Sequence, residues 1–161
     1  MGTGELGVYY TSGGSKRVHH QALIHSIEGT FTRNPRTGRI QRMKSGGHGQ
    51  ANLELLDKLG IRYHIDEILP NDVRKGRVEG HAIRRKKEQP GQMWFPWYWS
   101  TRDIVKAGEH VSGLKSNRNK PEGIIWWGTY KGVRVGIIKR NGQIQSIFPA
   151  ENQPKPKGKR P

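Results

Sequence analysis

The C-terminal part of the chain most constrains the fold, because three strand-like runs follow one another with two-residue turns between them. The runs are 124–130, 133–139 and 143–148. Lys131-Gly132 and Asn141-Gly142 separate them, and Asn-Gly is a strong signal for a tight hairpin turn. Strands joined in this way pair antiparallel with their neighbours. The sequence therefore predicts an antiparallel sheet in this region.

Two earlier stretches are typical of helices. Residues 51–59 place three leucines on one side, and Gly60 follows as a stop signal. Ser100 and Asp103 have the Ser-x-x-Asp spacing of a capping box, which predicts a helix over about 101–111. The helices precede the sheet in the chain, and this order indicates an α+β fold.

The remaining segments are shorter. Residues 18–25 indicate a short helix or turn, and 26–43 a hairpin around a Pro- and Gly-containing turn. Two strand-like runs are expected at about 61–69 and 73–85. We expect one folded domain over residues 18–149, after a flexible Gly- and Ser-rich lead-in at 1–17 and before a disordered, basic, Pro- and Lys-rich tail at 150–161.

Charge is the main compositional signal. The chain has 29 Lys and Arg against 13 Asp and Glu, a net charge of +16. This excess favours a polyanionic partner such as nucleic acid, because it otherwise destabilises the compact state by self-repulsion. The absence of cysteine excludes disulfides, cysteine-based zinc sites and thiol nucleophiles. We expect neither a membrane-spanning segment nor a signal peptide, since no apolar run is long enough.

A glycine-flanked histidine, Ser45-Gly46-Gly47-His48-Gly49, indicates a chemical function. Glycines on both sides allow a sharp backbone turn and leave the imidazole open to a ligand, which also makes Gly47 a candidate substrate contact. A second histidine, His25, lies upstream across the expected hairpin. Two histidines can cut RNA without metal, one as base and one as acid. No cluster of His and carboxylate residues suggests a metal, and we expect no cofactor.

Three motifs in one order carry a resemblance to a known family. They are Gly46-Gly47-His48, Phe95-Pro96-x-x-Trp99-Ser100, and the closing run at 142–149. Together they resemble the bacterial EndoU endoribonucleases, which occur as C-terminal toxin domains of contact-dependent growth inhibition and related secreted effectors. The resemblance implies a small α+β ribonuclease fold with an antiparallel sheet, shared in outline with barnase-like and RelE-like nucleases.

The resemblance also implies an activity. Such enzymes cleave RNA, often tRNA in the toxin members, and leave a 2′,3′-cyclic phosphate. The two catalytic histidines of the family fall on His25, by analogy the acid, and His48, by analogy the base. The chain would be secreted as the C-terminal part of a larger effector and act in the cytoplasm of a target cell. Its producer would be protected by an acidic immunity protein.

Two positions depart from the family pattern. Phe148 stands where the family has tyrosine, so the ring is kept and the hydroxyl is lost, while Ser146 matches the family's Thr or Ser. Both are candidate substrate-binding residues. The family's catalytic lysine usually lies shortly before the Phe-Pro motif, but residues 89–94 contain none. Lys86 and Lys87 are the nearest cations able to stabilise developing charge.

Other residues are weaker candidates. Arg84 and Arg85 begin a charge run that can bind RNA phosphates if it lies beside the catalytic cleft. His81, after Gly80, is a candidate substrate contact, whereas His64 alternates with apolar neighbours and is expected on a sheet face. The aromatic run 94–99 is expected to be chiefly core.

Two other functions are compatible with part of this pattern. A non-catalytic basic RNA-binding module would keep the charge and the aromatic residues, but it would not need His25 and His48. A metal-dependent DNase is disfavoured because clustered His and carboxylate ligands are absent.

Overall fold

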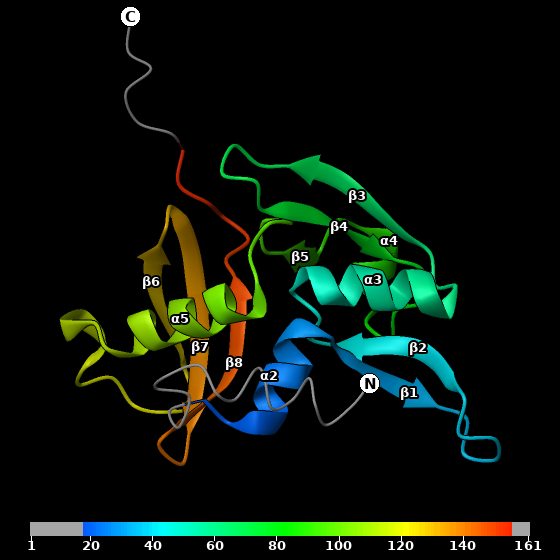
Figure 1. The fold of residues 1–161 in the computed structure, drawn as a ribbon, viewed down its shortest axis with the longest axis horizontal. Helices are drawn as coiled ribbons and strands as arrows, with labels where there is room; N and C mark the ends of the chain where they lie inside the picture. Colours follow the sequence, from blue (N-terminus) through cyan, green and yellow to red (C-terminus); the bar gives the residue numbers. More distant parts are fainter. Residues whose placement is uncertain (1–17, 156–161) are drawn as a thin grey trace, which may run out of the picture.

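The computed structural model describes residues 18–155, so the expected lead-in at 1–17 lies outside the described residues. It is an α+β fold with three antiparallel sheets, ordered β1-β2, β3-β4-β5 and β6-β7-β8 (Figure 1). The elements are α2 (His20–Ile27), β1 (Thr30–Arg33), β2 (Ile40–Ser45), α3 (Gln50–Leu59), β3 (Tyr63–Ile68), β4 (Arg74–Val78), α4 (Arg84–Glu88), β5 (Gln92–Trp94), α5 (Thr101–Ser112), the 3-10 helix η2 (Lys115–Asn117), β6 (Ile125–Tyr130), β7 (Val133–Arg140) and β8 (Gln143–Pro149). The predicted α+β class is confirmed, with the β-structure divided among three small sheets.

The sheet β6-β7-β8 is the antiparallel meander that the two-residue turns predict. Both turns adopt left-handed backbone, with φ of 49° at Lys131 and 77° at Gly132, then 54° at Asn141 and 76° at Gly142. Two successive positive φ values are the mark of the type I′ turn, whose twist matches that of the flanking strands. The turn chemistry therefore accounts for the register of this sheet.

Helix α5 covers one face of the meander (Figure 1). Its predicted capping box is confirmed: the Ser100 N–H donates to Asp103 Oδ2 at 2.8 Å, and the Asp103 N–H donates to Ser100 Oγ at 3.2 Å. One stripe of the helix is buried together with alternate residues of β7. These core residues are Ile104, Val105, Ala107, Val111, Val133, Val135 and Ile137. The burial fixes α5 on this face and turns the other set of β7 side chains to the opposite face.

Helix α2 lies along the free edge of β8. Val18 forms a parallel bridge with Ile144, and the Ser26 hydroxyl accepts a hydrogen bond from the Ile147 N–H at 3.0 Å. Leu23 and Ile27 are buried in the same core as α5. These contacts attach the C-terminal end of α2, and therefore His25, to the C-terminal sheet.

The other two sheets pack on α3 through a second apolar cluster. Its buried members are Met43, Leu53, Leu56, Val78 and Trp94. The α3 helix ends as predicted at Gly60, which has a φ of 74°. Leu59, however, is 38% exposed and is not part of this cluster.

The expected strand over 73–85 is wrong in its second half. Strand β4 ends at Val78, and the charge run beginning at Arg84 is the short helix α4. Arg84 pairs with Glu88 one helical turn later at 3.0 Å, and long unbranched side chains favour a helix. Strand β5 was not predicted, because three residues are too few to show a period of two.

The tail expected to be disordered from residue 150 begins with packed residues. Ala150 is buried, and Gln153 accepts from the Arg134 N–H at 2.8 Å and donates to the Arg134 carbonyl at 3.0 Å. Glu151 forms an ion pair with Arg85 at 2.7 Å. The amide of Gln153 thus continues the pairing beyond β8, while residues 156–161 lie outside the described part of the chain.

Candidate active site

The glycine-flanked histidine loop is docked on the C-terminal end of α2. The last carbonyls of a helix have no partner within the helix and need donors from elsewhere. Three successive N–H groups of the loop supply them: Gly47 to His25 O at 2.9 Å, His48 to Ser26 O at 2.6 Å, and Gly49 to Ile27 O at 3.2 Å. This docking brings His25 and His48 together although they are far apart in the sequence.

Glycine is required at two positions of this loop. Gly46 and Gly47 have φ of 68° and 73°, in the left-handed region that disfavours other residues. A Cβ on Gly46 would collide with the His25 carbonyl, and one on Gly47 would lie 2.5 Å from the Asn52 amide nitrogen. Gly47 was expected to contact substrate. It is buried and its N–H is already donated, so in the structure it shapes the loop.

Three hydrogen bonds from residues in β5 or directly after it hold the loop from the other side. The buried Gln92 amide donates to the carbonyls of Gly46 at 3.0 Å and Gly47 at 3.1 Å. The Phe95 N–H donates to the His48 carbonyl at 2.7 Å. Gln92 was not predicted as a site residue, because nothing in the sequence marks a glutamine as the partner of a distant loop.

The His48 ring is held in one orientation by a backbone carbonyl. Its Nδ1 lies 2.8 Å from Met93 O, which can only accept a hydrogen bond. Nδ1 therefore carries the proton and leaves a lone pair on Nε2. Burial, and after it the charge of Lys86, lowers the pKa of His48 to about 3 despite the opposing hydrogen bond to Met93. The imidazole is neutral at physiological pH and equipped to accept a proton.

His25 lies in the last turn of α2 and is only partly buried. Its Nδ1 is 2.9 Å from the Thr30 hydroxyl, at the first residue of β1. Burial, followed by the charge of Lys86, lowers the pKa of His25 below 6.5. Its positive form is thus disfavoured until a negative group arrives.

Lys86 is the cation of α4 that acts on these histidines. It is partly buried, whereas Lys87 is exposed. The Lys86 charge lowers the pKa of His25, His48 and His81, and such an effect requires a short separation. Burial, with the charge of Arg85, lowers the pKa of Lys86 itself. Of the two predicted lysines, Lys86 is the one close to the histidines.

The two arginines of α4 are engaged in exposed ion pairs. Arg84 pairs with Glu88 at 3.0 Å, and Arg85 pairs with Glu151 at 2.7 Å. Exposed pairs of this kind are weak and can exchange for a phosphate. Both residues remain predicted RNA contacts, with a competing carboxylate already on each.

His81 lies in the turn after β4 and is buried. Its Nδ1 accepts a hydrogen bond from the Ile83 N–H at 2.9 Å, so in the neutral ring Nε2 carries the proton. Among the described residues this buried Nε2 has no hydrogen-bond partner. Burial, followed by the charge of Lys86, lowers the pKa of His81 to about 4.

An aromatic surface adjoins the histidine pair on the sheet face opposite α5. Phe148 is 6.2 Å from the His48 ring, centroid to centroid, and 5.8 Å from the Trp127 ring. Arg134 lies 4.3 Å over the Trp127 ring. Ser146 lies on β8 next to Phe148, two residues away on the same strand. Phe148 and Ser146 are predicted site residues, whereas Trp127 and Arg134 were not predicted, because they join this surface only through strand pairing.

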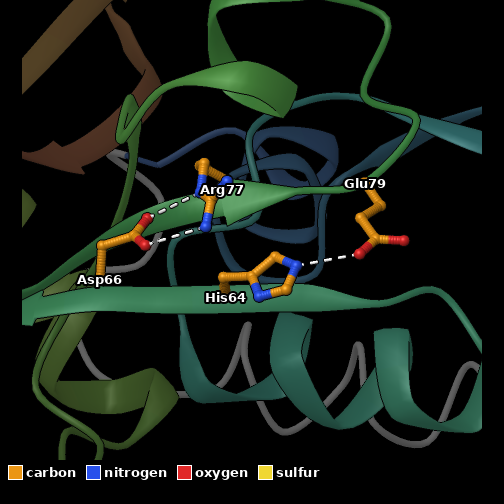
Figure 2. Close-up of polar contacts among 4 residues, drawn as sticks. All are labelled: His64, Asp66, Arg77 and Glu79. Atoms are coloured by element: carbon orange, nitrogen blue, oxygen red, sulfur yellow. Dashed lines mark hydrogen bonds and ion pairs between the residues drawn. The ribbon is translucent and has the colours of Figure 1, made fainter.

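His64 lies outside this site. It is on the exposed face of the β3–β4 hairpin, as predicted, with Nε2 2.9 Å from the Glu79 carboxylate. Figure 2 shows this pair beside the two-point contact of Arg77 with Asp66, at 3.0 and 3.1 Å. These contacts connect neighbouring strands and involve none of the catalytic candidates.

Two searches of the described residues gave negative results. No group of three or more histidine, aspartate or glutamate side chains there is placed to hold a metal ion. No helix within residues 18–155 has the length and apolar character needed to cross a membrane.

A family model described as bacterial EndoU nuclease matches residues 19–151, which include every candidate site residue named above. No curated protein matches the chain, and no solved structure matches it.

Proposed function

Because the chain belongs to the bacterial EndoU nuclease family, we propose that it cleaves RNA by transesterification, with His48 as general base and His25 as general acid. The observation that carries this proposal is the docking of the histidine loop on the end of α2. It places a neutral imidazole with a fixed tautomer beside a second, partly exposed imidazole. The nearby Lys86 supplies a positive charge.

In the first half of the proposed step, His48 Nε2 takes the proton from a ribose 2′-hydroxyl. The resulting oxygen attacks the adjacent phosphorus and forms a new P–O bond. A pKa of about 3 leaves the imidazole neutral, with a free lone pair, at neutral pH, and the negative phosphate of a bound RNA raises this pKa and with it the basicity of the ring. DNA lacks the 2′-hydroxyl and therefore cannot react in this way.

In the second half, His25 gives a proton to the 5′-oxygen as its bond to phosphorus breaks. The products are a 2′,3′-cyclic phosphate and a 5′-hydroxyl. A bound phosphate next to His25 raises the pKa of the imidazole, since an opposite charge favours the protonated form. The substrate therefore offsets the lowering of that pKa by burial and Lys86.

Lys86 is proposed to stabilise the negative charge that develops on the phosphoryl oxygens. A fixed cation that is already partly desolvated is most effective when charge builds up in the transition state. His81 Nε2–H is a second proposed contact, because a substrate oxygen would satisfy its unpaired buried donor.

The aromatic surface is proposed to position the nucleotide. Phe148 can stack on a sugar or base beside His48, and Ser146 is the nearest polar side chain on that strand. Without the tyrosine hydroxyl of the family pattern, Phe148 contributes only its ring.

The biological setting is also proposed from the resemblance. The chain would be the toxin part of a larger secreted effector. It would act on RNA in the cytoplasm of a target cell, and tRNA is the first candidate substrate. In the producing cell an acidic immunity protein would block it. The net charge of +16 favours both polyanionic RNA and an acidic protein partner. A neighbouring gene for a small acidic protein that inhibits cleavage would support this setting.

One experiment tests the activity directly. The protein is incubated with total tRNA in EDTA, and the 3′ ends of the fragments are analysed. We expect cleavage without added metal and fragments that end in a 2′,3′-cyclic phosphate, while DNA of the same sequence stays intact. RNA that is left whole in EDTA but cut after addition of a divalent metal would contradict the proposal.

A further inference from the structure

The β1–β2 hairpin carries a high positive charge that the proposed chemistry does not use. Residues 30–45 contain five basic side chains and no acidic one, a net charge of +5 within the +16 of the whole chain. The five are Arg33, Arg36, Arg39, Arg42 and Lys44, and all are exposed. Within the described residues, none of the five forms an ion pair.

The hairpin is an ordered frame rather than a loose loop. Asn34 closes its turn: its side chain accepts from the Arg36 N–H at 2.8 Å, and its N–H donates to the Arg39 carbonyl at 2.8 Å. At the other end, Phe31 and Met43 pack in the second apolar cluster. Cations on such a frame lose less conformational freedom when they bind a ligand.

The base of the hairpin is part of the candidate active site. Thr30 contacts His25 at 2.9 Å, and β2 leads directly into the loop that carries His48. Thr32, two residues after Thr30, lies on the same face of β1, and its register partner is Arg42. Arg42 therefore lies on the face of the hairpin that continues from His25.

The tip of the hairpin is remote from the chemistry. Figure 1 shows β1 and β2 extending away from the rest of the molecule, with the turn at the outer end. Six residues of extended β2 span about 20 Å. Arg36 and Arg39, in that turn, cannot reach a phosphate at the histidine pair, but they can reach a longer RNA that passes it.

We propose that the β1–β2 hairpin is an RNA-binding arm, which binds phosphates of the strand flanking the cleavage site. The proposal rests on the proposed cleavage of RNA and adds a length requirement to it. Arginine forms paired hydrogen bonds to phosphate, and each neutralised phosphate releases condensed counterions. The arm would then favour long RNA over short RNA without taking part in bond cleavage.

The test uses the full chain with Arg36, Arg39 and Arg42 all replaced by Gln. In the matched control, Gln replaces Arg102, Lys106 and Arg118. These residues are also exposed, but they lie on α5 and on the segment after it. Both variants lose the same charge. Each is assayed with tRNA and with a dinucleotide, across a range of salt concentrations, and tRNA binding is measured separately by fluorescence anisotropy.

We expect the hairpin variant to cleave the dinucleotide at the wild-type rate and to lose about tenfold or more in kcat/KM on tRNA at low salt. The plot of the logarithm of its tRNA affinity against the logarithm of the salt concentration should become less steep. The slope should change by about 2 to 3, which is the contribution of three phosphate contacts. The control should keep the wild-type slope. Equal losses in both variants would show that only net charge matters and would overturn the proposal.

Unchanged affinity of the hairpin variant for tRNA would also overturn the proposed RNA-binding arm. These arginines would then be candidates for binding an acidic protein partner instead. If the wild-type protein cuts neither substrate while tRNA binding still depends on the hairpin, the proposed cleavage fails and the RNA-binding arm stands. The anisotropy measurement thus separates the two proposals.

Discussion

At the scale of single residues, Lys86 is the group whose charge lowers the pKa of His25, His48 and His81. We expect Lys86→Met to lower kcat by about 10²–10³, the usual effect of removing one group that stabilises transition-state charge. Lys87→Met is the matched control, because Lys87 is the next residue and is exposed. Equal losses in the two variants would contradict the assignment to Lys86.

The pH dependence of kcat/KM gives a second readout of the same pair of variants. In the proposed mechanism His48 must be neutral and His25 protonated, so activity should rise through about pH 3 and fall through the pKa of His25, which lies below 6.5. Removing the Lys86 charge raises the pKa of His25. The alkaline limb of Lys86→Met should therefore move to higher pH, whereas the limb of the control Lys87→Met should stay in place.

At the scale of elements, the histidine loop depends on glycines that have no room for a side chain. We expect Gly47→Ala to destabilise the fold and to displace His48, because its Cβ would lie 2.5 Å from Asn52 Nδ2 and Met43 Cε. Gly60→Ala is the matched control, with nearly the same φ, 74° against 73°, and open space around it.

The control variant Gly60→Ala measures the cost of the left-handed backbone alone, because no atom lies within 4 Å of the added Cβ. Gly60→Ala should cost about 1 kcal/mol in chemical denaturation, the price of a left-handed alanine, and leave cleavage unchanged. Gly47→Ala should cost more than this and lose most of its activity. If the two variants match in stability and rate, the close packing of the loop is not needed for the position of His48.

The elements that local chemistry specifies could be predicted from the sequence. The capping box at Ser100 and the Asn141-Gly142 turn act through neighbours in the chain, and both have the expected geometry. Strand β5 depends on its pairing with β4, and the bracing role of Gln92 depends on a loop more than 40 residues away, since Gln92 bonds to Gly46. Such contacts leave no periodic signal.

The residues of the candidate site also separate into those that the sequence could predict and those that it could not. The expected hairpin and the family resemblance could pair His25 with His48, but the sequence does not show that the histidine loop docks on the end of a helix. The preference for Lys86 over Lys87 in the proposal depends on the structure, because Lys86 is partly buried and its charge lowers the pKa of the histidines, whereas Lys87 is exposed. Trp127 enters the site only through its pairing with β7.

At the scale of the whole molecule, the two histidines with strongly lowered pKa values, His48 and His81, should make stability depend on pH. The pKa is lowered to about 3 for His48 and about 4 for His81, from 6.5 in the unfolded chain. Below pH 6.5 the unfolded state binds protons that the native state does not, so the free energy of unfolding should fall as pH falls. The stabilisation is complete above pH 6.5.

The measurement is chemical denaturation between pH 6.5 and 5, above the range where most carboxylates titrate. Each histidine contributes at most about 1.4 kcal/mol per pH unit. High salt screens the repulsion within a chain of net charge +16, so that the remaining slope reports the histidines. His81→Gln should reduce this slope, because it removes one of the groups whose pKa is lowered in the folded protein. A free energy of unfolding of the wild-type protein that does not change over this pH interval would show that neither His48 nor His81 resists protonation in the folded protein.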